Sequence, residues 1–220
     1  MSSTIIPGST ATAATEPPSI PTRPPRDHYH HGDLRTALVE AGTRMLEEVG
    51  LEKLSLRGIA ARVGVSHTAP KNHFDGLRGL LSAIAAAGFR RHAAVMTEGV
   101  DGRTSPEERL RAACEGYVRF AREEPETFRL MFSPPRLDYA DPALKEAAGA
   151  SYAVLAEVAS SVRWLPADGS EPNAGQTETM LWSFVHGYAN LAVSGEFGAG
   201  CEAFPVMAVL PRFEVRGSGS

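Results

Sequence analysis

The sequence predicts an all-α protein of about nine helices, in which an N-terminal three-helix helix-turn-helix domain is joined to a larger helical domain. Two observations indicate this fold class. Apolar residues recur at helical spacing through most of the chain, with no convincing strand and no internal repeat. Charge is divided unevenly, since residues 23–92 hold 11 Lys and Arg against 7 Asp and Glu, whereas residues 93–220 hold 11 against 18. A basic part beside an acidic part is typical of a chain with two tasks.

The composition indicates a folded protein of the cytoplasm. Of the 220 residues, 43% are hydrophobic, so a core can form without disulfides or metals. The two cysteines, Cys114 and Cys201, lie far apart and make no disulfide framework, which fits a reducing compartment. The chain contains no apolar run long enough to cross a bilayer, and it begins without the pattern of a secretory signal. We therefore expect a cytoplasmic protein with no membrane partner.

Four segments are expected along the chain. Residues 1–27 are rich in Ser, Thr, Ala and Pro and predict a disordered tail. The helix-turn-helix domain is predicted over residues 28–75, and a second, larger helical domain over residues 76–212. Residues 213–220 are expected to form a flexible C-terminus.

Apolar spacing and capping residues place the helices of the N-terminal domain. The first helix, which Gly50 ends, carries an apolar stripe of Leu34, Leu38, Ala41 and Met45. Ser55 is placed to cap a second, shorter helix, which stops at Gly64, and Ser66 is placed to cap a third. A longer fourth helix is expected to follow.

The C-terminal domain has clear helix start signals. Residues 105–108, Ser-Pro-Glu-Glu, form a capping box with proline at the first helical position. Pro125 opens another helix, and Asp141 followed by Pro142 caps the next. The most apolar helix is predicted over about residues 176–194, and a short last helix over about residues 202–210.

The run GVSHTAPKNHF, from Gly64 to Phe74, predicts the second half of a helix-turn-helix. In that motif the second helix enters the major groove and must expose short polar side chains near its N-terminus. We expect Pro70 to be tolerated because it stands only four positions past the cap. The alternative is a plain surface hairpin of helices. The residues expected to contact DNA are Ser55, Arg57, Ser66, His67, Thr68, Lys71, Asn72, His73 and Arg78.

These residues resemble a known family. The segments HYHHGDLRTALVEAG, LSLRGIAARVGVSHTAPKNHF and LRGLLSAIAAAGF look like the DNA-binding domain of TetR-type (TetR/AcrR) transcriptional regulators. The segment LWSFVHGYANLAVSG, with Trp182 followed by His186 and Gly187, resembles the WHG variety of their ligand domain. The resemblance implies a homodimer that binds a near-palindromic DNA operator, more often as a repressor than as an activator. It also implies that residues 76–212 form a ligand-binding and dimerisation domain, and that a small, mostly apolar effector releases the protein from DNA.

Two positions depart from the family pattern. Lys71 stands where the family usually has a tyrosine that contacts the DNA backbone, and Leu77 stands where a lysine is usual. Lys71 and Arg78 can still meet phosphates, so DNA binding remains the expected function.

Two further sets of residues are expected in the C-terminal domain. His186 is predicted either to be a core histidine with a hydrogen-bond partner or to be a polar anchor in an apolar pocket. The residues expected at the ligand pocket are Tyr117, Phe120, Phe128, Met131, Phe132, Tyr152, Leu155, Trp182 and His186. The residues expected at the dimer interface are Trp182, Val185, Ala189, Leu191, Val193, Val206 and Leu210.

Metal binding and catalysis are weighed against these expectations. His28, His30 and His31 have loose spacing with no cysteine or carboxylate at ligand geometry, so we expect a helix entry and no metal. His28 is better interpreted, together with Arg23 and Arg26, as a basic arm that touches DNA. The sequence contains no nucleophile elbow, no zinc-protease motif and no phosphate-binding loop. We expect no cofactor and no enzyme; the alternative is an all-α enzyme or small-molecule-binding protein without a DNA role.

Overall fold

The computed structural model describes residues 31–197 and 205–216, with the side chains of residues 31–33 left out. The expected disordered tail and basic arm lie outside these ranges. The described residues form eight α-helices, three short 3-10 helices and one two-stranded sheet, which confirms the all-α class. None of the helices in the described ranges is long and apolar enough to span a bilayer. The α-helices are α1 His31–Val49, α2 Leu56–Val63, α3 Gly76–Met96, α4 Pro106–Glu123, α5 Pro125–Met131, α6 Pro142–Ser161, α7 Ala174–Ser194 and α8 Val206–Val209.

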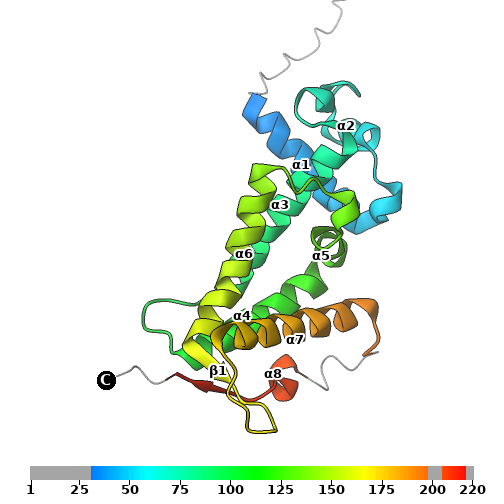
Figure 1. Cartoon of the computed structure of the whole chain (residues 1–220). Helices are drawn as coiled ribbons and strands as arrows, with labels where there is room; N and C mark the ends of the chain where they lie inside the picture. The colour runs from blue at the N-terminus through cyan, green and yellow to red at the C-terminus, as the bar shows by residue number, and fades with distance from the viewer. Residues whose placement is uncertain (1–30, 198–204, 217–220) are drawn as a thin grey trace, which may run out of the picture.

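The N-terminal helices gather at one end of the molecule (Figure 1). We call this end the head: α1, the 3-10 helix η1 Leu51–Lys53, α2, and the 3-10 helix η2 Ala69–Asn72. Its core is apolar and fully buried, with Leu38, Leu46 and Ile59 at 0% exposure. The sequence spacing of these residues therefore places one face of each helix inward, as expected.

The long helix α3 joins the head to the remaining helices, which we call the body. Near its start Ile84 packs into the head, where a Cβ added at Gly42 would lie 2.7 Å from the Ile84 Cδ1 atom. One turn later Gly88 faces the body, where an added Cβ would lie 2.7 Å from the Thr127 Cγ2 atom. One apolar cluster thus runs through both parts. The division of the chain at residue 76 stays a prediction.

The start signals of the body helices act as the sequence predicts. The Ser105 Oγ atom accepts a hydrogen bond from the Glu108 amide at 3.3 Å, and the Glu108 carboxylate accepts one from the Ser105 amide at 2.8 Å. The Asp141 carboxylate accepts from the Ala143 amide at 2.8 Å and caps α6. These bonds satisfy amides that have no partner within their own helices. In Figure 1, α6 runs beside α3, and α4 and α7 lie side by side at the end away from the head.

A small sheet corrects the expectation that the chain has no strand. Strand β1, Val162–Trp164, pairs antiparallel with β2, Phe213–Val215. The ladder continues on both sides, since the Leu165 amide donates to the Arg212 carbonyl at 2.8 Å and the Arg216 amide to the Ser161 carbonyl at 3.0 Å. The expected flexible end from residue 213 is therefore wrong for residues 213–215. Strands of three residues are too short to show alternation in a sequence.

The last helix is shorter than predicted. Helix α8 covers only Val206–Val209, within the range of about 202–210 that the sequence indicates. Residues 202–204 lie outside the described part of the chain. Pro205 stands at its N-cap and Pro211 follows it closely, which leaves little room for more turns.

Candidate functional site

The turn between α2 and η2 has the backbone that a helix-turn-helix requires. The Ser55 Oγ atom accepts a hydrogen bond from the Gly58 amide at 3.1 Å, so Ser55 caps α2 as predicted. Gly64 ends the helix with φ at 78°, a left-handed conformation that glycine adopts without steric cost. The Val65 amide then bonds back to the Ala60 carbonyl at 3.0 Å and turns the chain away from the helix.

The expected third α-helix of the head is instead a turn followed by a short 3-10 helix, Ala69–Asn72, with Thr68 rather than Ser66 at its N-cap. The cause is Pro70, which has no amide hydrogen to donate and whose ring would collide with the carbonyl four residues earlier in an α-helix. The backbone bonds accordingly span three residues, as from the Lys71 amide to the Thr68 carbonyl at 3.1 Å. Pro70 is thus less well tolerated than the sequence interpretation assumed.

The short helix is anchored by apolar residues and presents its polar ones outward. Pro70 is buried and Phe74 is 7% exposed, with the guanidinium of Arg35 lying 5.2 Å from the centre of the Phe74 ring. His73 is half-buried. The residues of this element that are fully at the surface are Ser66, His67, Thr68, Lys71 and Asn72. All five belong to the set expected to contact DNA, and no side chain of the body covers them.

The remaining residues predicted to contact DNA lie in two different settings. Ser55 and Arg57 are exposed at the start of α2, beside the turn. Arg78 instead donates from its Nε and Nη2 atoms to the carbonyl oxygen of Leu137, at 3.1 and 2.7 Å. Two donors of its guanidinium are used inside the chain, but Arg78 is exposed and its remaining donors are not used in these bonds, so a contact with phosphate stays a prediction. That bond was invisible in the sequence because it joins positions 59 residues apart.

The body contains a cluster of aromatic rings around two histidines. The Tyr117 hydroxyl and the His186 Nδ1 atom lie 2.8 Å apart, so His186 has the hydrogen-bond partner expected of a core histidine. The His92 Nδ1 atom lies 2.7 Å from the Ser151 Oγ atom, and its ring contacts that of Tyr117 edge-on at 4.3 Å. Burial lowers the pKa of His92 to about 3, with His186 nearby as a second cause. Burial also lowers the pKa of His186 and raises that of Tyr117.

The predicted pocket residues divide into a core and a rim. The five core members are at most 2% exposed and pack against one another, so they do not line an open cavity: Tyr117, Phe120, Phe128, Met131 and Leu155. The rim consists of Phe132 and His186, which are half-buried, and Trp182 and Tyr152, which are 38% and 44% exposed. Because buried side chains can line a closed cavity, the place of these core members at an effector pocket stays a prediction. Periodicity alone does not distinguish packed aromatics from cavity walls.

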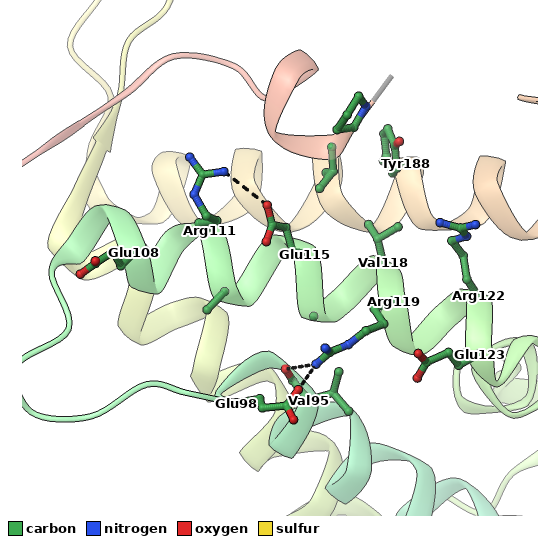
Figure 2. Close-up of a pocket in the computed structure, with 14 residues that line it drawn as sticks. Val95, Glu98, Glu108, Arg111, Glu115, Val118, Arg119, Arg122, Glu123 and Tyr188 are labelled. Atoms are coloured by element: carbon green, nitrogen blue, oxygen red, sulfur yellow. Dashed lines mark hydrogen bonds and ion pairs between the residues drawn. The ribbon is translucent and has the colours of Figure 1, made fainter. Parts of the chain in front are cut away.

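A groove that the sequence interpretation missed lies along the outer face of α4 (Figure 2). Its volume is about 960 Å³, and α3, α7 and the start of α8 complete its walls. Its lining is strongly charged, with an ion pair between Arg111 and Glu115 at 3.3 Å and another between Arg119 and Glu98. None of the nine predicted pocket residues lines this groove. Alternating charges at i and i+4 along residues 111–123 were the available signal, and they predict only a solvated helix face.

Burial also divides the predicted dimer interface. Val185 and Ala189 are 0% exposed and Val206 is 5% exposed, all within a single chain. They belong to the core of one protomer, so placing them at an interface is wrong. Trp182 and Leu191 are 38% and 46% exposed and remain available to a partner. Val193 and Leu210 are partly buried.

The histidines considered for metal binding lie beyond what the structure describes. His28 and His30 are outside the described ranges, and the side chain of His31 is also left out. Among the side chains that are described, no three His, Cys, Asp or Glu residues come together in a way that could hold a metal ion. Cys114 is buried, which raises its pKa to about 12 and keeps the thiol protonated.

An exposed helix-turn-helix head on a helical body defines a transcriptional regulator of the helix-turn-helix class. Comparison with known proteins narrows this class. Residues 110–207 match a family model described as the C-terminal domain of tetracyclin repressor-like proteins. The chain belongs to the TetR family of transcriptional regulators.

Solved structures share the fold over most of its length. A protein of unknown function from Rhodococcus sp. RHA1 is 30% identical, with 84% of this chain and 93% of that chain covered and a TM-score of 0.65. A TetR family transcription regulator from Marinobacter aquaeolei VT8 is 19% identical, with coverage of 81% and 96% and a TM-score of 0.55. A regulatory protein of the TetR family from Rhodococcus RHA1 is 16% identical, with coverage of 73% and 83% and a TM-score of 0.52. No curated protein matches the sequence.

Proposed function

We propose that this protein is a ligand-responsive repressor that binds a near-palindromic operator as a homodimer. The observation that carries the proposal is the exposed polar surface of residues 66–72, which is held out from the head by buried Pro70 and Phe74. Short hydroxyl, amide and imidazole groups of this kind match the donors and acceptors of base edges in the major groove. Lys71 adds a positive charge suited to a phosphate.

Dimerisation is proposed through the outer faces of α6 and α7. Tyr152, Trp182 and Leu191 leave large apolar side chains exposed there, at 44%, 38% and 46%. Added Cβ atoms at Gly149 and Gly187 would meet nothing within 4 Å, so this face can accept a closely packed partner. Leu191→Glu is expected to shift the protein from dimer to monomer in light scattering and to weaken operator binding. Val209→Glu, on an apolar residue that is also exposed at 43%, is the matched control and should leave the dimer intact.

The effector is proposed to be small and mostly apolar, and to enter at the rim of Phe132, Tyr152, Trp182 and His186. The rim rings contact one another, with the Phe132 and His186 centroids 4.4 Å apart and those of Tyr152 and Trp182 5.9 Å apart. His186 supplies a polar group within this apolar surface, as small-molecule sites require. A thermal-shift screen of small molecules tests this part, since a ligand that binds the folded state raises the melting temperature. Hits should lose their effect in Phe132→Ala, at a rim residue outside the proposed dimer face, and should release DNA from the wild-type protein.

The DNA-binding proposal is tested with duplexes selected from a random-sequence pool by the wild-type protein. Binding measured across salt concentrations should give a negative slope of log affinity against log salt, because each phosphate contact releases counterions. Lys71→Ala should weaken binding to every duplex and make the slope shallower by roughly 1.8, about 0.9 for each of the two copies of Lys71 in the dimer. Lys145→Ala, an exposed lysine on α6 of the body, is the matched control. A slope near zero, or no duplex enriched above the starting pool, would contradict the proposal.

A further inference from the structure

Polar contacts to one short stretch of the chain add to the apolar packing between head and body. That stretch begins with α5 and ends just after the 3-10 helix η3, Pro134–Arg136. In Figure 1 it lies between the head and the helices α4 and α7. We call the set of contacts the clamp. Its members are Glu47 with the amides of Glu126 and Thr127, Arg78 with the carbonyl of Leu137, Ser82 with the amide of Asp138, and Arg136 with Glu52.

Glu47 makes the most demanding of these contacts. Its two carboxylate oxygens, on α1 of the head, accept hydrogen bonds from the Glu126 amide at 3.1 Å and the Thr127 amide at 2.7 Å. These are among the first amides of α5, which have no carbonyl partner inside that helix. A negative charge is favoured at this end of a helix, and bonds to a charged acceptor are stronger than neutral ones. Glu47 thus performs, from another part of the fold, the role of a capping residue.

The other side of α5 is fixed in the body. The Gly88 position of α3 has no room for a side chain, since an added Cβ would lie 2.7 Å from Thr127 Cγ2 and 2.8 Å from the Met131 sulfur. Phe128 is 1% exposed, with its ring centre 6.0 Å from that of Tyr117 and 5.6 Å from that of His186. A helix held this closely does not drift within its own half of the molecule. The Glu47 carboxylate therefore attaches the head to a rigid part of the body.

We propose that Glu47 is a positioning residue that fixes the orientation of the head on the body, and so sets the half-site spacing that the dimer accepts. This rests on the proposed function, because spacing has a meaning only when two heads bind one duplex. Two heads must meet half-sites separated by one helical turn of roughly 34–36 Å, or a multiple of it. A head that swings about α3 moves its exposed residues away from that separation, although each head still fits a single half-site.

The first test compares a full operator with a half-site, using the selected duplex and a version in which one half is scrambled. Glu47→Ala should weaken binding to the full operator by roughly tenfold, the loss expected for one charge-assisted contact, and leave half-site binding unchanged. Glu47→Gln, which keeps one accepting oxygen, should fall in between. Repeating the selection with variable spacers should return a wider range of spacings for Glu47→Ala. The matched control is Glu40→Ala, which removes an exposed carboxylate from the same helix.

Equal losses on the full operator and the half-site would overturn the proposal, since they would indicate damage within the head. Unchanged binding to both would overturn it as well. Failure of the wild-type protein to bind any duplex would remove the proposed function and the spacing role together.

A second test needs no DNA, so it examines the contact between head and body independently of the proposed function. Nitroxide labels at Ala61→Cys in the head and Glu123→Cys in the body, both exposed, report their separation by pulsed electron resonance. Cys201 is changed to Ser, buried Cys114 is kept, and labelled chains are diluted with unlabelled ones. Glu47→Ala should broaden the distance distribution relative to wild type and Glu40→Ala. An unchanged distribution would overturn the positioning role whatever the DNA results.

Discussion

The head and the body use their side chains in opposite ways. In the head, five polar residues between Ser66 and Asn72 are exposed at the surface. Exposed polar side chains of this kind contribute little to the free energy of unfolding. In the body, the aromatic rings around His92 and His186 pack against one another, and Tyr117, Phe120 and Phe128 are each 1% exposed. Residues that contribute little to folding but remain precisely placed on an ordered scaffold are candidates for external contacts. The difference predicts that substitutions in the body change stability and that substitutions in the short helix change recognition.

Phe128→Ala should have the largest effect on the free energy of unfolding. The ring is 1% exposed and packs against Tyr117, His186 and Phe132, so truncation leaves a cavity. We expect the free energy of unfolding to fall by about 3–5 kcal/mol in urea titration. Val209→Ala, which truncates an exposed apolar side chain, should change it by less than about 0.5 kcal/mol. Similar values for the two variants would mean that the aromatic cluster is not the stabilising core.

Gly116→Ala should have the next largest effect on the free energy of unfolding. A Cβ at this position of α4 would lie 2.4 Å from the Val95 carbonyl oxygen and 2.7 Å from the Met96 Cα atom, both backbone atoms of α3. Since backbone cannot rotate aside, the two helices must separate, at a cost of about 1–3 kcal/mol. The control is Gly79→Ala on α3, where an added Cβ comes no closer than 3.5 Å to another atom, an ordinary van der Waals contact. That control should stabilise the protein by roughly 0.5–1 kcal/mol, because alanine favours the helix.

Acid should destabilise the body through His92. The pKa of His92 is lowered to about 3 by burial, whereas the unfolded side chain titrates near 6.5. Below pH 6.5 the unfolded state binds a proton that the folded state does not, so stability falls as the pH decreases toward 3. The slope due to this group is about 1.4 kcal/mol per pH unit between pH 6 and 5. Urea titrations at several pH values should show that the free energy of unfolding depends less steeply on pH in His92→Gln than in the wild-type protein.

Asn72→Ala should have the smallest effect on stability. A larger effect would mean that the short helix contributes to folding as the body does. The side chain is exposed on η2, so the free energy of unfolding should change by no more than about 0.5 kcal/mol. If Asn72 contacts a base, selection from random duplexes should show relaxed preference at one position, by about 1–3 kcal/mol. Uniform weakening on all duplexes would instead indicate a phosphate contact.

The two regions also differ in how far the sequence predicts them. Helix starts such as Ser105 and Asp141 were predicted correctly because a capping residue acts on amides two or three positions away. The short helix η2 is predicted at the right residues but with the wrong helix type, because Pro70 excludes the α-helical bond pattern. The bond from Arg78 to Leu137, and the packing of the aromatic residues expected at the pocket, depend on distant parts of the chain. Such contacts are set by the assembled fold, and no local pattern reports them.

The proline-anchored turn has a practical consequence for redesign. An ordinary reading helix can be retargeted along several turns, but here Pro70 and Phe74 hold the element to a single short segment. Under the proposed function, a library that varies only the exposed positions 67, 68, 71 and 72 would explore most of the specificity of this segment while leaving its fold untouched. It is small enough to be screened completely in one bacterial reporter experiment.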